Sequence, residues 1–154
     1  MEPITTRSIP EQPVLAIRGV VAPALFPSFI GGAFGELYQC LETVGIDPEG
    51  PPMARYHDVG PDSIDVEICV PVPSGTIGTG RIVPGVLPAE TVATVLHIGS
   101  YDGEGEAYAA LEGWLQAHGY AHGGPPRERY LVGPDADVEP AEYRTQIEMP
   151  IVAA

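Results

Sequence analysis

Lysine is absent from this chain, and positive charge of any kind is scarce. The 154 residues contain seven basic residues, all of them Arg, against 21 Asp and Glu, so the formal net charge is −14. A protein that binds nucleic acid through its phosphates needs clustered positive charge, so we expect no nucleic-acid partner. The negative excess favours cationic ligands, although it also serves solubility alone. Without lysine, a Schiff-base mechanism is excluded.

Cysteine and long apolar runs are also scarce. Cys40 and Cys69 are too few for a disulfide framework, and the N-terminal MEPITTRSIP lacks the apolar core of a secretion signal. No run approaches the roughly 18 apolar residues of a membrane-spanning helix. These absences predict a soluble cytoplasmic protein with reduced thiols. His118 and His122 are four residues apart, but the helix expected here ends at Gly119 and cannot hold both on one face, so we expect neither a metal nor a cofactor.

The sequence does contain two stretches that alternate strictly between apolar and polar residues. The apolar sets are Tyr143, Thr145, Ile147, Met149 and Ile151 in one stretch, and Ile64, Val66, Ile68, Val70 and Val72 in the other. The opposite sets are Arg144, Gln146, Glu148 and Pro150, and Asp65, Glu67, Cys69 and Pro71. Alternation of this kind indicates a β-strand with one face in the core and one polar face.

The remaining periodicities place these strands in a repeated order of elements. Strands are expected at residues 13–21, 53–59, 64–72, 81–87, 90–99, 127–132 and 142–152. Helices are expected at about residues 29–44, with Ser28 as the cap, and at about residues 104–118. Gly45 and Gly119 are suited to end these helices.

A short motif supports a duplication. Residues 50–56, GPPMARY, match residues 124–130, GPPRERY, at five of seven positions. In each copy a strand and a helix precede the motif and an alternating strand follows it. We therefore predict a single α+β domain over residues 1–154, built from two pseudo-symmetric strand–helix–strand–strand repeats at about residues 13–72 and 90–152. The repeats would form one antiparallel sheet with both helices on one face and a concave groove on the other.

Several features together resemble the GyrI-like (gyrase-inhibitor-like) family, which includes the effector-binding domains of AraC-type and MerR-type regulators. They are the tandem repeat, Gly99-Ser100-Tyr101, the Trp114-Leu115 pair and the closing Glu148-x-Pro150-Ile151, so the resemblance spans about residues 14–151. It implies a groove between the halves that binds lipophilic aromatic, often cationic, compounds. A carboxylate near the end of the last strand, here Glu148, would meet the positive charge. The regulators carry a separate DNA-binding domain, for which this chain has no room, so transcriptional control is not implied.

The candidate site residues combine negative charge with aromatic surface. Glu148 and Glu67 are the candidate carboxylates, because a Glu in a partly dry groove attracts a cation more strongly than one in bulk water. The candidate walls are Tyr56, Tyr101, Tyr130, Phe34 and Trp114, and a cation–π contact adds about 0.5–2 kcal/mol. Structural alternatives remain open. Glu148 could be an exposed strand residue, Glu67 could pair with Arg144 or Arg18, the tyrosines could be half-buried structural residues, and Trp114 could belong to the core.

The expected function is that of a stand-alone multidrug-binding protein for small hydrophobic cationic or aromatic ligands. The alternative is an enzyme, since some stand-alone members of the family hydrolyse cyclopropane-bearing, DNA-alkylating compounds. A hydrolase would use Glu148 or Glu67 as a general base on water and Tyr130 or Tyr101 as a hydroxyl donor. A protein partner such as gyrase stays open, although the acidic surface alone does not support it.

Overall fold

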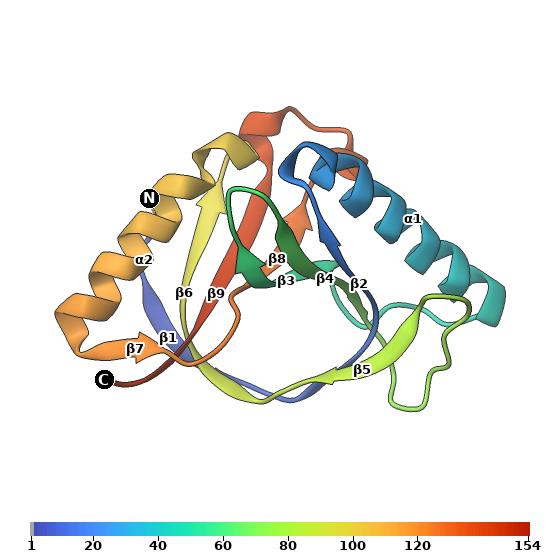
Figure 1. Ribbon diagram of the computed structural model, residues 1–154, viewed down its shortest axis with the longest axis horizontal. Coiled ribbons are helices and arrows are strands. Elements are labelled where there is room, and N and C mark those ends of the chain that lie inside the picture. Colours follow the sequence, from blue (N-terminus) through green and yellow to red (C-terminus); the bar gives the residue numbers. More distant parts are fainter. Residues whose placement is uncertain (1) are drawn as a thin grey trace. The chain divides into compact units, whose positions relative to one another are not determined.

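The computed structural model describes residues 2–154, and the chain divides into two compact units. The first unit is Glu11–Pro88, and the second unit combines Ala89–Ala154 with the N-terminal segment that ends at Pro10. Both units follow the order strand, helix, strand, strand (Figure 1). The α+β fold class is therefore confirmed, while the shared groove remains a prediction.

The first unit is a four-stranded antiparallel sheet with one long helix. Its strands lie in the order β3-β4-β2-β5. Its elements are β2 (Gln12–Val21), the short helix η1 (Pro23–Leu25), α1 (Phe26–Val44), β3 (Met53–Val59), β4 (Ile64–Pro71) and β5 (Val83–Leu87).

The second unit has the same plan with one more strand. Its antiparallel strands lie in the order β1-β6-β9-β8, and β7 also pairs with β9. Its elements are β1 (Thr5–Ile9), β6 (Glu90–Ile98), η2 (Tyr101–Gly103), α2 (Glu104–His118), β7 (Tyr120–His122), β8 (Arg127–Val132), η3 (Pro134–Ala136), η4 (Pro140–Glu142) and β9 (Arg144–Ala153).

The core of the second unit lies between α2 and one face of its sheet. Ala107, Leu111 and Leu115 of α2 form one buried cluster with Ile147 and Met149 of β9. Burying each large apolar side chain is worth about 1.5–3 kcal/mol. Because side chains alternate along a strand, the even-numbered residues of β9 lie on the face without a helix.

A glycine identifies the corresponding face of the first unit. A Cβ built on Gly19 would lie 2.7 Å from the ring of Phe29, so α1 packs against the side of β2 that carries Gly19. Leu15 and Ile17 share this side. The opposite face holds a separate buried cluster of Val14, Ala16, Met53, Cys69 and Leu87.

The strand registers match between the two units. Met53 lies opposite Cys69, and Arg127, at the equivalent position of the other GPP motif, lies opposite Glu148. The register of β3 on β4 shifts just after Tyr56, and that of β8 on β9 shifts just after Tyr130. The two copies of the motif thus lead into strands with the same irregularity.

Three local predictions need correction. Helix α1 begins at Phe26, before the expected start, because Pro27 is suited to the first helical turn. Ser28 is therefore no cap, and its hydroxyl donates to the carbonyl of Leu25 at 3.1 Å. Strands β1 and β7 were not expected, since β1 buries only Ile9 and shows no apolar alternation. The glycines predicted to end the helices do so, with φ of 73° at Gly45 and 75° at Gly119.

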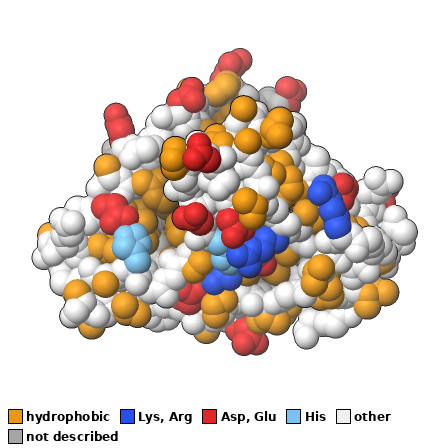
Figure 2. Space-filling model, in the orientation of Figure 1, with side chains coloured by type: hydrophobic (Ala, Val, Ile, Leu, Met, Phe, Trp, Pro, Cys, Tyr) orange, Lys and Arg blue, Asp and Glu red, His pale blue; other side chains and the backbone are white. Residues whose placement is uncertain are grey.

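The surface reflects the acidic composition. Figure 2 shows acidic side chains dispersed over the face that it draws. Within residues 2–154 no helix is long and apolar enough to cross a membrane.

Candidate functional site

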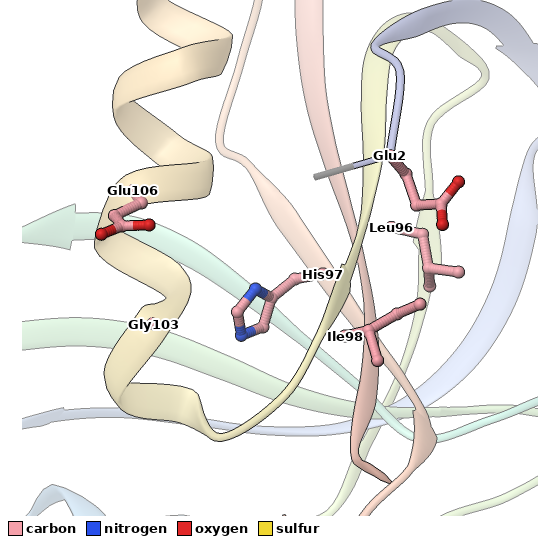
Figure 3. Close-up of a pocket in the computed structure, with 6 residues that line it drawn as sticks. All are labelled: Glu2, Leu96, His97, Ile98, Gly103 and Glu106. Atoms are coloured by element: carbon pink, nitrogen blue, oxygen red, sulfur yellow. The ribbon is translucent and has the colours of Figure 1, made fainter. Parts of the chain in front are cut away.

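One pocket of the second unit contains none of the residues predicted for the site. It has a volume of about 220 Å³ and lies between β6 and the start of α2 (Figure 3). It is lined by Glu2, Leu96, His97, Ile98, Gly103 and Glu106. The imidazole Nε2 of His97 lies 2.8 Å from the carbonyl oxygen of Ser100, which fixes the ring against the turn before α2.

Glu148 lies on β9, on the face of its sheet opposite α2. Glu148 is 1% exposed, and the Arg129 guanidinium donates from Nε to Glu148 Oε1 at 2.9 Å. The alternative of an exposed strand residue is therefore wrong. A ligand cation at this carboxylate would share it with a guanidinium that is already in place.

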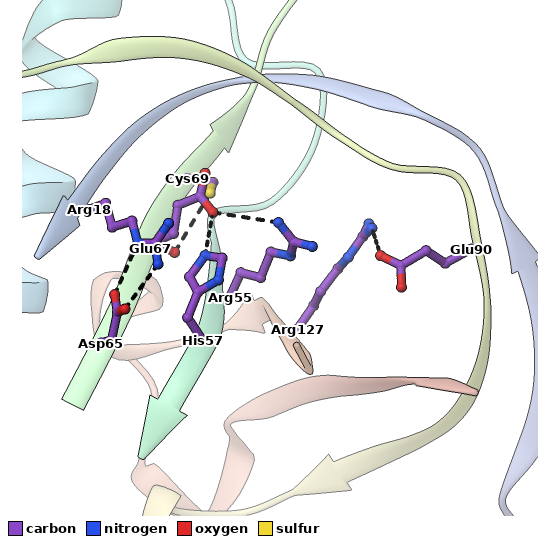
Figure 4. Close-up of polar contacts among 8 residues, drawn as sticks. All are labelled: Arg18, Arg55, His57, Asp65, Glu67, Cys69, Glu90 and Arg127. Carbon is purple, nitrogen blue, oxygen red and sulfur yellow. Dashed lines mark hydrogen bonds and ion pairs between the residues drawn. The ribbon is translucent and has the colours of Figure 1, made fainter. Parts of the chain in front are cut away.

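Glu67 is also paired with basic side chains, on the helix-free face of the first unit. The His57 Nε2 atom lies 2.9 Å from Glu67 Oε1, and Arg55 approaches the same oxygen at 3.8 Å (Figure 4). Arg18, one of the two partners considered for Glu67, instead binds both oxygens of Asp65, at 3.0 and 2.9 Å. The basic side chains in contact with Glu67 are therefore His57 and Arg55.

A buried arginine was missed by the sequence reasoning. Arg127 is fully buried and donates from a terminal guanidinium nitrogen to Glu90 at 2.7 Å (Figure 4). Arg127 is on β8, where it lies opposite Glu148 of β9 and belongs to the same helix-free face. Nothing local in GPPRERY indicates this burial, because the partner carboxylate is 37 residues away. The helix-free face of the second unit therefore combines acidic and basic side chains.

Aromatic rings gather instead at the N-terminal end of α2. The ring centroids of Tyr101 and Tyr130 are 6.0 Å apart with an edge-to-face angle of 85°, and those of Tyr101 and Tyr143 are 5.3 Å apart. Tyr101 is 40% exposed, so its ring is accessible from solvent. The structure thus brings together two of the predicted tyrosines and adds Tyr143.

Two carboxyl groups accompany these rings. Glu128 is 4% exposed and accepts hydrogen bonds from the hydroxyls of Tyr108, at 2.5 Å, and Tyr130, at 2.9 Å. Glu104, the first residue of α2, lies beside it. Burial, followed by the charge of Glu128, raises the pKa of Glu104 to about 8. We call Tyr101, Tyr108, Tyr130, Tyr143, Glu104 and Glu128 the tyrosine–carboxyl cluster.

Spacing in the sequence could have revealed this cluster. Glu128 and Tyr130 are two apart on a strand and share a face, and Glu104 and Tyr108 are four apart on one side of a helix. Glu104 also lies in the first turn of α2, where a negative charge is favourable for the helix dipole.

The hydroxyl of Tyr101 remains protonated at neutral pH. Burial, and then the negative charge of Glu104, raises the pKa of Tyr101 to about 12. A second hydroxyl, that of Thr145, is completely buried and favours the charged form of Glu104. Among the described residues, however, neither Thr145 Oγ1 nor Glu104 Oε1 has a partner at hydrogen-bond geometry.

The other three predicted aromatic residues lie elsewhere. Trp114 packs against the core of the second unit and stacks on His118, at 4.1 Å, and Tyr120, at 5.6 Å. It is ten residues beyond Glu104 along α2, roughly 15 Å at the helical rise. In the first unit, Tyr56 lies 6.1 Å from the Phe26 ring. Phe34, on α1, is half-buried.

The chain belongs to the GyrI-like family, since the model of the GyrI-like small molecule binding domain matches residues 2–152. This confirms the resemblance seen in the sequence. Among curated proteins no match is found.

Solved structures agree with this assignment. The EcmrR C-terminal domain is 28% identical with a TM-score of 0.88, and the match covers 100% of this chain and 99% of that one. In the EcmrR–DNA complex the identity is 30% and the TM-score 0.88, and the match covers 99% of this chain but 58% of that one. The chain therefore spans little more than half of that DNA-bound protein.

More distant structures share the fold. SAV2435 bound to tetraphenylphosphonium is 12% identical with a TM-score of 0.67, and the match covers 97% of this chain and 94% of that one. A hydrolase from Listeria innocua is 12% identical with a TM-score of 0.73, and the match covers 98% of this chain and 92% of that one.

Proposed function

We propose that this protein binds lipophilic aromatic cations, and that the tyrosine–carboxyl cluster holds their positive charge. The observation that carries this proposal is the environment of Glu128. Its carboxylate accepts hydrogen bonds from the hydroxyls of Tyr108 and Tyr130. The two oxygens of Glu128 are thus oriented by tyrosine hydroxyls, next to the aromatic surface of Tyr101 and Tyr130.

The arrangement suits a cation that is itself apolar. A cation over an aromatic face gains about 0.5–1 kcal/mol at an exposed site and about 2 kcal/mol when desolvated. Tyr101 offers such a face at 40% exposure, with Tyr130 and Tyr143 beside it. The lipophilic cation in the SAV2435 structure is a ligand of this type, which supports the choice of ligand class.

Glu148 and Glu67 are the less favourable positions in this proposal. A cation that took over either carboxylate would have to displace a guanidinium or an imidazole. Breaking a buried ion pair costs about 3–5 kcal/mol. The ion pair of Arg129 with Glu148 is of this kind, since the Glu148 side chain is 2% exposed.

Calorimetric titration with tetraphenylphosphonium tests the proposal. Tyr101→Ala should weaken binding about tenfold, the equivalent of about 1.4 kcal/mol, because it removes the exposed aromatic face. Tyr38→Ala is the matched control, since Tyr38 is 39% exposed but lies on α1. Glu148→Gln separates the two candidate carboxylates. A large loss with Glu148→Gln and none with Tyr101→Ala would refute the cluster as the site.

A second function, hydrolysis of electrophilic ring compounds such as cyclopropanoids, is favoured by one observation. Glu104 has a pKa raised to about 8 and so holds a proton beside Glu128, which is the pairing of acid and base that ring opening by water needs. One structure of this fold is described as a hydrolase. In this reading Tyr130 or Tyr101 would donate to the leaving oxygen, and Glu148 or Glu67 remain the alternative bases. Mass spectrometry of a cyclopropanoid substrate would end this candidate if product does not exceed the uncatalysed background.

A further inference from the structure

We propose that Gly133 is a positioning residue for the aromatic cation, because its missing side chain lets the Tyr101 ring take the position in which its exposed face meets the ligand. This inference rests on the proposed function and adds to it the residue that sets the geometry of the binding face. Gly133 is buried, follows β8 directly and begins the loop that leads to Tyr143. It acts through Tyr101 and does not itself touch the ligand.

The backbone of Gly133 lies close to the hydroxyl of Tyr101. A Cβ atom built on Gly133 would lie 3.1 Å from the phenolic oxygen, which is tighter than an ordinary van der Waals contact. The backbone angles of Gly133, φ −140° and ψ −163°, are extended and are accessible to any residue. A side chain is therefore disfavoured at this position by the Tyr101 ring and not by the backbone conformation.

Two further rings fix the Tyr101 ring in place. The Tyr130 ring meets it edge to face at 6.0 Å, and the Tyr143 ring lies against it at 5.3 Å with an interplanar angle of 33°. Tyr101 is still 40% exposed, so part of its surface is open to a ligand. A ring that is fixed before the ligand arrives loses little freedom on binding, so its position contributes to affinity as well as its presence.

Hydrogen bonds hold both ends of the loop between Gly133 and Tyr143. At its start, the Ala136 amide donates to the carbonyl of Gly133 at 3.0 Å and closes the turn η3. At its end, the Gly99 amide donates to the carbonyl of Tyr143 at 2.8 Å, two residues before Tyr101. The loop thus begins at the hydroxyl of Tyr101, ends at its ring, and is hydrogen-bonded to the segment that carries it.

Gly133→Ala tests this role, because its methyl group requires the Tyr101 hydroxyl to move by a few tenths of an ångström. Calorimetric titration with tetraphenylphosphonium should show binding weakened about threefold to tenfold. Tyr101→Phe keeps the ring and removes the atom that the methyl group would meet. In this background, Gly133→Ala should change the affinity by less than about twofold. A methyl group that acted only on the loop would weaken binding equally in both backgrounds.

Gly124→Ala is the matched control, since a Cβ atom there would lie 3.2 Å from Glu90 Oε2, a similarly tight contact before the start of β8. It should leave the affinity unchanged. If Gly133→Ala does not fold, recovery of folding and binding in the double variant with Tyr101→Phe still supports the inference, and no recovery overturns it.

Wild-type affinity in Gly133→Ala, or an equal loss in both backgrounds, would overturn the inference, while weaker binding by Tyr101→Ala would still support the proposed function. Unchanged binding by Tyr101→Ala would overturn both.

Discussion

The proton held by Glu104 should be visible in the stability of the protein without any ligand. The pKa of this carboxyl rises from an ordinary value of 4.5 to about 8 on folding, first because of burial and then because of the Glu128 charge. Between these two values the folded protein binds a proton that the unfolded chain has lost. The contribution of Glu104 to the free energy of unfolding is therefore complete below about pH 4.5, and it is lost as the pH rises through the raised pKa.

The size of this effect follows from the shift. Each pKa unit corresponds to about 1.4 kcal/mol, so the full shift would give about 4–5 kcal/mol. Glu104 is only partly buried, and solvent screening of such a group reduces the contribution by half or more. We expect the free energy of unfolding to decrease by about 2 kcal/mol between pH 5 and pH 8 because of this residue.

Urea denaturation of the wild type and of Glu104→Gln at several pH values measures it directly. Glutamine resembles the protonated acid, so the two proteins should be equally stable near pH 5, and the variant should be about 2 kcal/mol more stable near pH 8. Glu106→Gln controls for removal of an acid from the same helix turn. Parallel stability curves for wild type and Glu104→Gln across this range would show that Glu104 titrates normally, and the reasoning about the cluster would be wrong.

The remaining predictions concern packing and ion pairs. Gly19→Ala should lower the free energy of unfolding by about 1–3 kcal/mol in urea denaturation, because its methyl group would overlap the Phe29 ring. Gly31→Ala has open space and should stabilise α1 by up to about 1 kcal/mol, so an equal loss for both variants would contradict the close approach at Gly19. Arg129→Met should cost about 3–5 kcal/mol, since it leaves Glu148 buried without its guanidinium, and adding Glu148→Gln should recover part of that loss; a cost below about 1 kcal/mol would mean that the pair is solvated.

Periodicity in the sequence was enough to locate most of the fold. The helix predicted at residues 104–118 and the strands at 53–59 and 127–132 coincide with α2, β3 and β8. Each of these elements has a regular apolar face or a clear Pro or Gly boundary. Strand β1 has neither, and it is held by pairing with β6, more than eighty residues further along, which no local pattern encodes.

The candidate site was harder to predict, because it depends on which polar groups meet in the folded protein. Alternation placed Glu148 opposite the core side of β9 correctly, but it gave no sign that Arg129 would lie against its carboxylate. Glu104 and Glu128 are 24 positions apart in sequence, and they become neighbours only in the folded protein, where Tyr108 of α2 donates a hydrogen bond to Glu128 on β8. Pairing of charges is a tertiary property, and this explains why the predicted carboxylates differ from those of the tyrosine–carboxyl cluster.

The most direct test of the account is a crystal structure of the protein with bound tetraphenylphosphonium. The account predicts that the cation lies within about 6 Å of the Tyr101 or Tyr130 ring, and nearer to the carboxylate of Glu128 than to that of Glu148. A cation bound against Glu148 or Glu67, with the tyrosine–carboxyl cluster unchanged, would contradict it.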